Sequence, residues 1–91
     1  MALSTEQCLQ LNYDETGDVL YASLGEPQPA ISFEVDTDIL LRYVPPSSKV
    51  VGITIMNFLM HFPYSSSAAF EVHAANVVAD LLRKYPEVPV S

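Results

Sequence analysis

Residues 13–24 decide the fold, and they read Tyr-Asp-Glu-Thr-Gly-Asp-Val-Leu-Tyr-Ala-Ser-Leu. Aromatic and apolar side chains stand on both sides of an acidic segment, 14–18, that contains a glycine. Such a segment is typical of the loop of a β-hairpin, in which Gly17 would adopt a positive φ angle. The stretch therefore predicts two antiparallel strands joined by a short turn.

Further strands are predicted on the C-terminal side of this hairpin. The segments 8–13 and 31–36 alternate between apolar and polar side chains, which favours strands with one buried face. The segments 39–44 and 50–56 are rich in apolar and β-branched residues, and turn-forming residues separate all of these runs. Short turns favour sequential antiparallel pairing, so we expect a four- or five-stranded β-meander over about residues 7–56.

A helix is predicted after an apolar connector at residues 57–66. The apolar residues that recur at helical spacing are Phe70, Ala74, Val77, Val78, Leu81 and Tyr85. Ser65 to Ser67 offer N-cap hydroxyls, and Pro86 and Pro89 end the helix, which leaves a tail at 86–91. We expect the helix, at about 67–85, to pack on one sheet face, so the prediction is an α+β fold in a single domain, 1–91.

The two faces of the predicted sheet differ less in polarity than the faces of a sheet that has one side in solvent. The expected core face comprises Ile31, Phe33, Val35, Ile39, Leu41, Tyr43, Val51, Ile53 and Ile55. Alternation along the strands places six more apolar residues on the opposite face: Leu20, Leu24, Leu40, Val44, Val50 and Met56. A second covering layer would explain them, either the connector 57–64 or another subunit. Because symmetric dimers are the commonest soluble assemblies, we expect a homodimer.

Charge and composition exclude several classes of function. Four Lys and Arg against eleven Asp and Glu give a net charge of −7, which argues against binding nucleic acid or an anionic membrane surface. The single cysteine, Cys8, excludes an internal disulfide. The first residues carry no basic and apolar leader, and the longest apolar region, 50–62, is too short and interrupted to span a bilayer. We expect a cytoplasmic protein.

The connector also offers an aromatic cluster, formed by Phe58, Leu59, Met60, Phe62 and Tyr64. Two interpretations stay open, a packed elbow between sheet and helix or a contact surface, since aromatic residues and Met are enriched at interfaces. The interface we predict combines this cluster with five residues of the sheet: Leu20, Leu24, Leu40, Val44 and Met56.

The polar candidates for chemistry are few. Asp14, Glu15 and Asp18 resemble a cation-binding loop only in part, because Val19 stands where a calcium loop needs glycine. We interpret them as turn residues and predict no metal and no cofactor.

His73, Asn76 and Asp80 lie on one side of the helix at spacings of three and seven residues. A histidine near a carboxylate can act as a general base, but a solvated helix face gives the same pattern.

Several motifs resemble the family called domain of unknown function 2283. They are Tyr13-Asp14, Asp18-Val-Leu-Tyr21, Ser23-Leu24, Glu34-Val-Asp36, Asp38-Ile-Leu-Leu41 and Val51-Gly-Ile-Thr-Ile55. The sequence departs from the family at Thr54, where Glu is frequent, and in its 45–49 turn. The resemblance implies a small antiparallel sheet with a helix and no established activity. It also implies an antitoxin-like or immunity-type role, since some members are thought to lie beside small toxin-like proteins.

The interpretation that these observations favour is a protein-interaction module, homodimeric and able to regulate another small protein in an antitoxin-like way. The alternative is a small enzyme or ligand-binding protein that uses the helix face of His73, Asn76 and Asp80.

Overall fold

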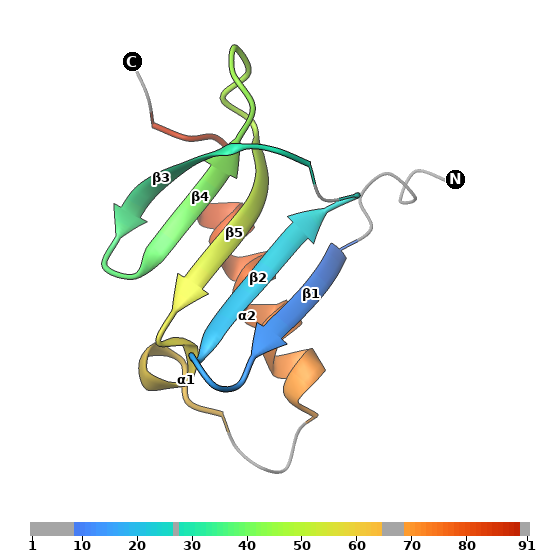
Figure 1. Ribbon diagram of the computed structural model, residues 1–91, viewed down its shortest axis with the longest axis vertical. Coiled ribbons are helices and arrows are strands. Elements are labelled where there is room, and N and C mark those ends of the chain that lie inside the picture. The colour runs from blue at the N-terminus through green and yellow to red at the C-terminus, as the bar shows by residue number, and fades with distance from the viewer. Residues whose placement is uncertain (1–8, 27, 65–68, 90–91) are drawn as a thin grey trace.

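Five antiparallel strands form one sheet, and two helices follow it in the chain (Figure 1). The computed structural model describes residues 9–26, 28–64 and 69–89. The strands are β1 Leu9–Asp14, β2 Val19–Leu24, β3 Ile31–Asp36, β4 Ile39–Tyr43 and β5 Val50–Met56, and the helices are α1 Phe58–His61 and α2 Phe70–Lys84. The predicted α+β class, with an antiparallel sheet and a C-terminal helix on it, is confirmed; Cys8 lies outside the described residues.

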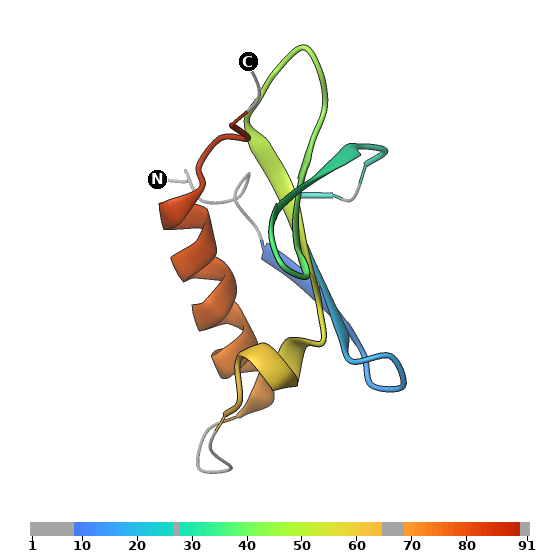
Figure 2. The ribbon, with the colours of Figure 1, turned by 90° about the vertical axis from the view of Figure 1, so that its left-hand side faces the viewer.

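The strand order is β1-β2-β5-β4-β3, so the strictly sequential meander was wrong at one step. β2 pairs with β5, with Leu20 opposite Ile55, and β3 lies at the far edge. The connection over residues 25–30 must cross three strand spacings, about 14 Å, and six extended residues reach about 20 Å. Its described part lies on the sheet face that α2 leaves open (Figures 1 and 2), where Arg42 Nη2 donates to the carbonyl of Gln28 at 3.3 Å.

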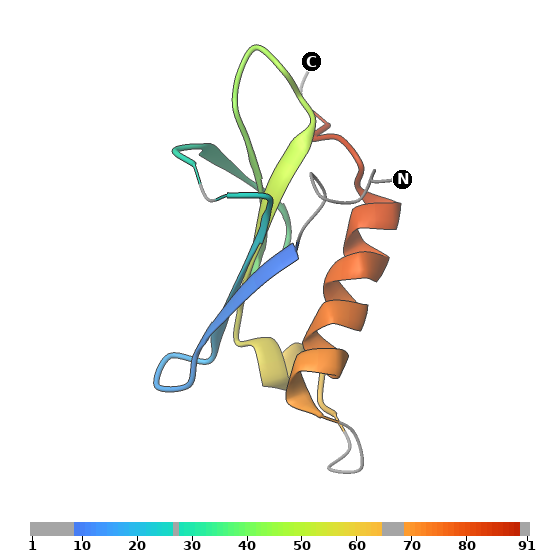
Figure 3. The same cartoon turned by 90° about the vertical axis from the view of Figure 1, so that its right-hand side faces the viewer.

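Helix α2 lies across the other face of the sheet (Figures 2 and 3). Ala74, Val78 and Leu81 of the predicted stripe are buried against the strands. The residue before the helix, Ala69, takes the N-cap position without a side-chain hydrogen bond, while the predicted capping serines, 65–67, lie outside the described residues. Among the residues described, no helix is long and apolar enough to cross a membrane.

The core between sheet and helix corrects the predicted division of the two faces. Leu20 and Val50 are 1% and 2% exposed, so neither is available on the opposite face. Leu20 shares a face with its partner Ile55, and alternation places Leu24 on the same side. Val50 turns inward because a β-bulge at the end of β4 pairs it with Tyr43 and shifts the alternation.

The segment after α2, predicted as a tail, returns to the sheet. Val88 is 3% exposed and joins the core. Its N–H donates to the carbonyl of Ser48 at 2.8 Å, and the N–H of Val50 donates to the carbonyl of Pro86 at 3.3 Å. The described part of this segment therefore closes the core next to the start of β5.

At the β3 edge the sheet extends beyond the helix. No helix lies behind β3 in Figure 1. Ile31, which was predicted to line the core, is 50% exposed, and Phe33 and Val35 are half-buried. The apolar side of β3 is therefore only partly covered, unlike that of β2, β4 and β5.

Candidate functional site

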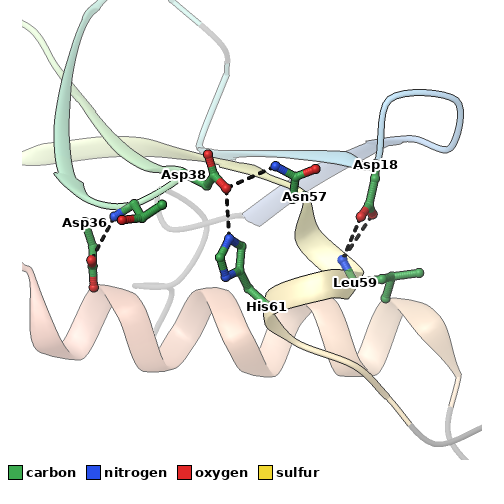
Figure 4. Close-up of polar contacts among 7 residues, drawn as sticks. Asp18, Asp36, Asp38, Asn57, Leu59 and His61 are labelled. Atoms are coloured by element: carbon green, nitrogen blue, oxygen red, sulfur yellow. Dashed lines mark hydrogen bonds and ion pairs between the residues drawn. The ribbon is translucent and has the colours of Figure 1, made fainter.

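One acidic residue of the β1–β2 turn, Asp18, holds helix α1 against the sheet (Figure 4). Its carboxylate accepts the N–H of Leu59 at 3.1 and 3.2 Å and the hydroxyl of Tyr13 at 2.6 Å. Its backbone carbonyl accepts the N–H of Phe58 at 2.9 Å. The first N–H groups of a helix have no partner within it. Asp18 supplies those partners, since the N-cap residue Asn57 makes no side-chain cap.

The same contact fixes the protonation of the tyrosine. The hydrogen bond to Asp18 raises the pKa of Tyr13 to about 12. Burial and the negative charges of Asp18, Glu15 and Asp14 raise this pKa further in the same direction. Tyr13 therefore remains a neutral phenol and a hydrogen-bond donor over the whole range around neutral pH.

Asp38 holds the other side of α1 (Figure 4). Its Oδ2 accepts a hydrogen bond from Asn57 Nδ2 at 3.0 Å and lies 2.9 Å from His61 Nε2. The hydrogen bond with His61, followed by that from Asn57, lowers the pKa of Asp38 below its ordinary value of 3.8, against a smaller desolvation effect. We call Asp18, Asp38, Asn57 and His61 the turn clamp.

Three residues of the turn clamp have left-handed backbone. The φ angles of Asp18, Asp38 and Asn57 are 57°, 65° and 53°, a conformation that Asp and Asn tolerate better than most residues. The prediction that Gly17 would take the positive φ was wrong, because Asp18 takes it. Within the described ranges, no three His, Cys, Asp or Glu side chains are grouped so that they could hold a metal ion.

The structure divides the aromatic connector between both interpretations. Phe58 is 0% exposed, and its ring packs within about 6 Å of several others, centroid to centroid: Tyr13 at 6.1 Å, Phe62 and Phe70 at 5.8 Å. Met60, two residues later, is 71% exposed. Phe58 is thus core, while Met60 points to solvent.

The ten residues predicted for an interface are not brought together. Leu20 and Phe58 are in the core, and alternation along β2 places the half-buried Leu24 on the same sheet face as Leu20. Leu40 and Met56 are half-buried on the open sheet face, and Met60 and Tyr64 are exposed. The remaining half-buried members are Val44, Leu59 and Phe62. Two separate surfaces therefore remain, the open sheet face and the α1 end.

His73, Asn76 and Asp80 do not form one polar site. His73 Nε2 lies 2.7 Å from the carbonyl oxygen of Phe62, and its ring stacks on Tyr64 at 5.2 Å with 20° between the planes. Asp80 pairs with Arg83 on the exposed side of α2, and Asn76 is exposed. The geometry gives His73 the role of a support for Tyr64.

A groove of about 590 Å³ opens beside α1. Six residues line it: Tyr13, Glu15, Leu59, Tyr64, Phe70 and Glu71. They come from the β1–β2 hairpin, α1, the segment that follows α1 and the first turn of α2. Three aromatic rings form its walls, and two exposed carboxylates carry its charge.

A smaller hollow, of about 300 Å³, lies on the open sheet face. Its lining is mostly polar, with Gln10, Asn12, Tyr21, Ser23 and Arg42 among its residues. Arg42 is held there by the carbonyl of Gln28 and packs over Gly52. A Cβ at Gly52 would approach the carbonyl oxygen of Ala22 to 2.8 Å, so this strand pairing requires glycine.

The family model for proteins of unknown function designated DUF2283 matches residues 10–58, which is 49 of the 91 residues. The chain belongs to the DUF2283 family. Comparisons with curated proteins and with solved structures found no match. The DUF2283 match runs from β1 to the first residue of α1 and so contains most of the turn clamp, but not α2.

Sequence reasoning found some of these residues and missed others. The acidic turns stood out, yet their role as supports of α1 did not, because Asp18 and Leu59 are 41 positions apart. Glu71 gave no signal beyond a charge in the first helical turn. The resemblance to DUF2283 was found in residues of all five strands and of two turns, and most of these residues prove to be architectural.

Proposed function

We propose that this protein is a protein-interaction module that works as a homodimer joined through strand β3. The observation that carries the proposal is the β3 edge, the strand Ile31–Asp36, where Ile31 is 50% exposed. An edge strand presents unpaired N–H and C=O groups to any strand that lies beside it. Pairing with another copy would satisfy those groups and cover the apolar side chains at once.

The sequence of β3 is complementary to itself. In an antiparallel pair centred on Phe33, each Phe33 faces the other and Ile31 faces Val35 of the second copy. Glu34 then faces Ser32 rather than another Glu34, so no like charges stand directly opposite. The bulge between Glu34 and Asp36 limits the paired stretch to about five residues per strand, 31–35, which predicts a reversible dimer with a dissociation constant on the order of 10 µM.

A role as regulator of another small protein, including an antitoxin-like role, is part of the same proposal. Such a role requires a surface that binds a partner, and joining two copies would present every remaining surface twice. Bivalent presentation raises apparent affinity without new contacts when a partner reaches both sites. The net charge of −7 favours a partner with basic side chains.

Multi-angle light scattering after size exclusion tests the dimer. The mass of the wild-type protein is expected to rise from monomer towards dimer as its concentration passes through the micromolar range. Ile31→Lys, which places a charge on the β3 edge, is expected to raise the dissociation constant about tenfold or more. Salt is expected to tighten the dimer, because each copy carries a charge of −7.

Val72→Lys is the matched control. Val72 is 54% exposed on α2, so this variant makes the same substitution at similar exposure away from β3. It is expected to keep the wild-type mass profile. A wild-type monomer at about 1 mM, or equal weakening by both variants, would contradict a dimer through β3.

A further inference from the structure

We infer that the groove beside α1 is a binding site for an arginine side chain of a partner protein. The site is formed by Tyr13, Glu15, Leu59, Tyr64, Phe70 and Glu71, with a volume of about 590 Å³. Its aromatic walls and its two carboxylates are the combination that recognises an organic cation. This inference goes beyond the dimer and does not depend on it.

The aromatic walls are held in place before any ligand arrives. The ring of Phe70 lies 4.6 Å from that of Tyr13 and 5.5 Å from that of Tyr64. Tyr64 stacks on His73, and His73 is anchored on the carbonyl of Phe62 at 2.7 Å. A site whose side chains are already ordered binds without the cost of fixing them.

The charge of the groove selects a cation. Glu15 and Glu71 are exposed at the groove, and none of its described lining residues is basic. A positive charge bound in the groove would be attracted by both carboxylates. The hydroxyl of Tyr13 is already donated to Asp18, so its ring contributes its face and no competing donor.

The lining of the groove, aromatic rings beside carboxylates, favours arginine over lysine. A guanidinium group is planar, stacks on aromatic rings and donates two parallel hydrogen bonds to a carboxylate. An ammonium group is a compact, strongly hydrated point charge that makes neither contact as well. An arginine side chain can therefore use the rings and a carboxylate in the same pose.

Titration of the ¹⁵N-labelled protein with capped Gly-Arg-Gly tests the inference. Saturable shifts are expected at the six lining residues, with a dissociation constant on the order of 1 mM for a single side chain. The lysine peptide is expected to bind about threefold more weakly than the arginine peptide. The neutral citrulline peptide is expected to bind at least about tenfold more weakly. Equal binding of the citrulline peptide would overturn the role of charge, and shifts scattered over the surface would overturn the site.

A pair of double variants separates the groove from the general field of an acidic protein. Glu15→Gln with Glu71→Gln is expected to weaken the arginine peptide about tenfold or more. Glu26→Gln with Glu87→Gln changes the net charge equally, from −7 to −5, away from the groove and is expected to leave the affinity within about twofold. Equal weakening by both pairs would contradict the inference.

The same titration of Ile31→Lys distinguishes this inference from the dimer. Unchanged arginine affinity in that variant is the expected result, because β3 takes no part in lining the groove. If the wild-type protein binds the peptide but stays monomeric, the arginine site is supported and the dimer is refuted. If the wild-type protein dimerises but shows no saturable shift up to about 50 mM peptide, the dimer is supported and the arginine site is refuted.

Discussion

At the turn clamp, two carboxylates accept hydrogen bonds from Tyr13, Leu59, Asn57 and His61, and the aromatic core closes beneath them. At the β3 edge, by contrast, an apolar side chain is half exposed and a whole row of backbone groups has no neighbouring strand. The acidic turns attract attention in the sequence, yet the structure uses them to hold α1. The regular alternation of β3 does not stand out in the sequence, yet the outer edge of this strand has no neighbouring strand. The hydrogen bonds of Asp18 and Asp38 are thus part of the architecture, and the β3 edge is where the packing is incomplete.

The largest expected effect comes from the aromatic core under the clamp. Phe58→Ala is expected to lower the free energy of unfolding by about 3–5 kcal/mol, because a fully buried ring leaves a cavity. Met60→Ala, in the same helical turn but 71% exposed, is expected to stay within about 0.5 kcal/mol. Urea denaturation of both variants measures the difference. Equal losses would show that α1 is not divided between core and surface.

The second effect concerns the cap that Asp18 provides. Asp18→Ala is expected to cost about 1–3 kcal/mol of unfolding free energy, since it removes the acceptor of Leu59 and Tyr13 and leaves a left-handed residue without its support. Asp36→Ala, in the other acidic turn, loses only an exposed contact with the N–H of Thr37 and is expected to cost less than about 0.5 kcal/mol. A reversed order, measured by urea denaturation, would contradict a clamp at Asp18.

The smallest effect is the pH dependence carried by Asp38. Its pKa is lowered in the folded protein, chiefly by the hydrogen bond with His61, so the unfolded chain takes up the proton first as the solution is acidified. This stabilisation is present above pH 3.8 and is lost as the pH falls through the lower folded value. Asp38→Asn is expected to flatten the acid limb of the stability profile.

His61→Gln is the companion variant, because it removes the largest cause of the shift and keeps Asp38 itself. It is expected to flatten the same acid limb in part. Thermal unfolding followed at several acidic pH values measures both variants. An acid limb that is unchanged in Asp38→Asn would contradict the assignment of this pH dependence to the clamp.

Local alternation was enough to predict the strands, the helix and the fold class, since periods of two and 3.6 are properties of the chain itself. It could not place β2 beside β5, because a six-residue connection allows both a hairpin and a crossing. That single step moved Leu20 into the core, and a bulge did the same for Val50. The β2–β5 pairing and the bulge both depend on how the strands pair, and alternation along one strand does not determine that pairing.

The candidate site was predictable only in pieces. Tyr13 and Tyr64 were singled out as aromatic residues, and Glu15 as part of an acidic turn. Their meeting with Glu71 depends on where α2 begins over the sheet, which no local pattern encodes. His73 was noticed as a potential base, and its stacking on Tyr64 became visible only in three dimensions.

Hydrogen exchange at several protein concentrations tests most directly whether the β3 edge, rather than the clamp, is where another copy binds. Amides of Ile31–Asp36 are predicted to exchange more slowly as the concentration rises through the micromolar range, because pairing with another copy would protect them. Amides of the other edge strand, Leu9–Asp14, and of α1 are predicted to exchange at rates independent of concentration. Exchange in β3 that does not change with concentration, or slowing confined to α1, would contradict a dimer through β3.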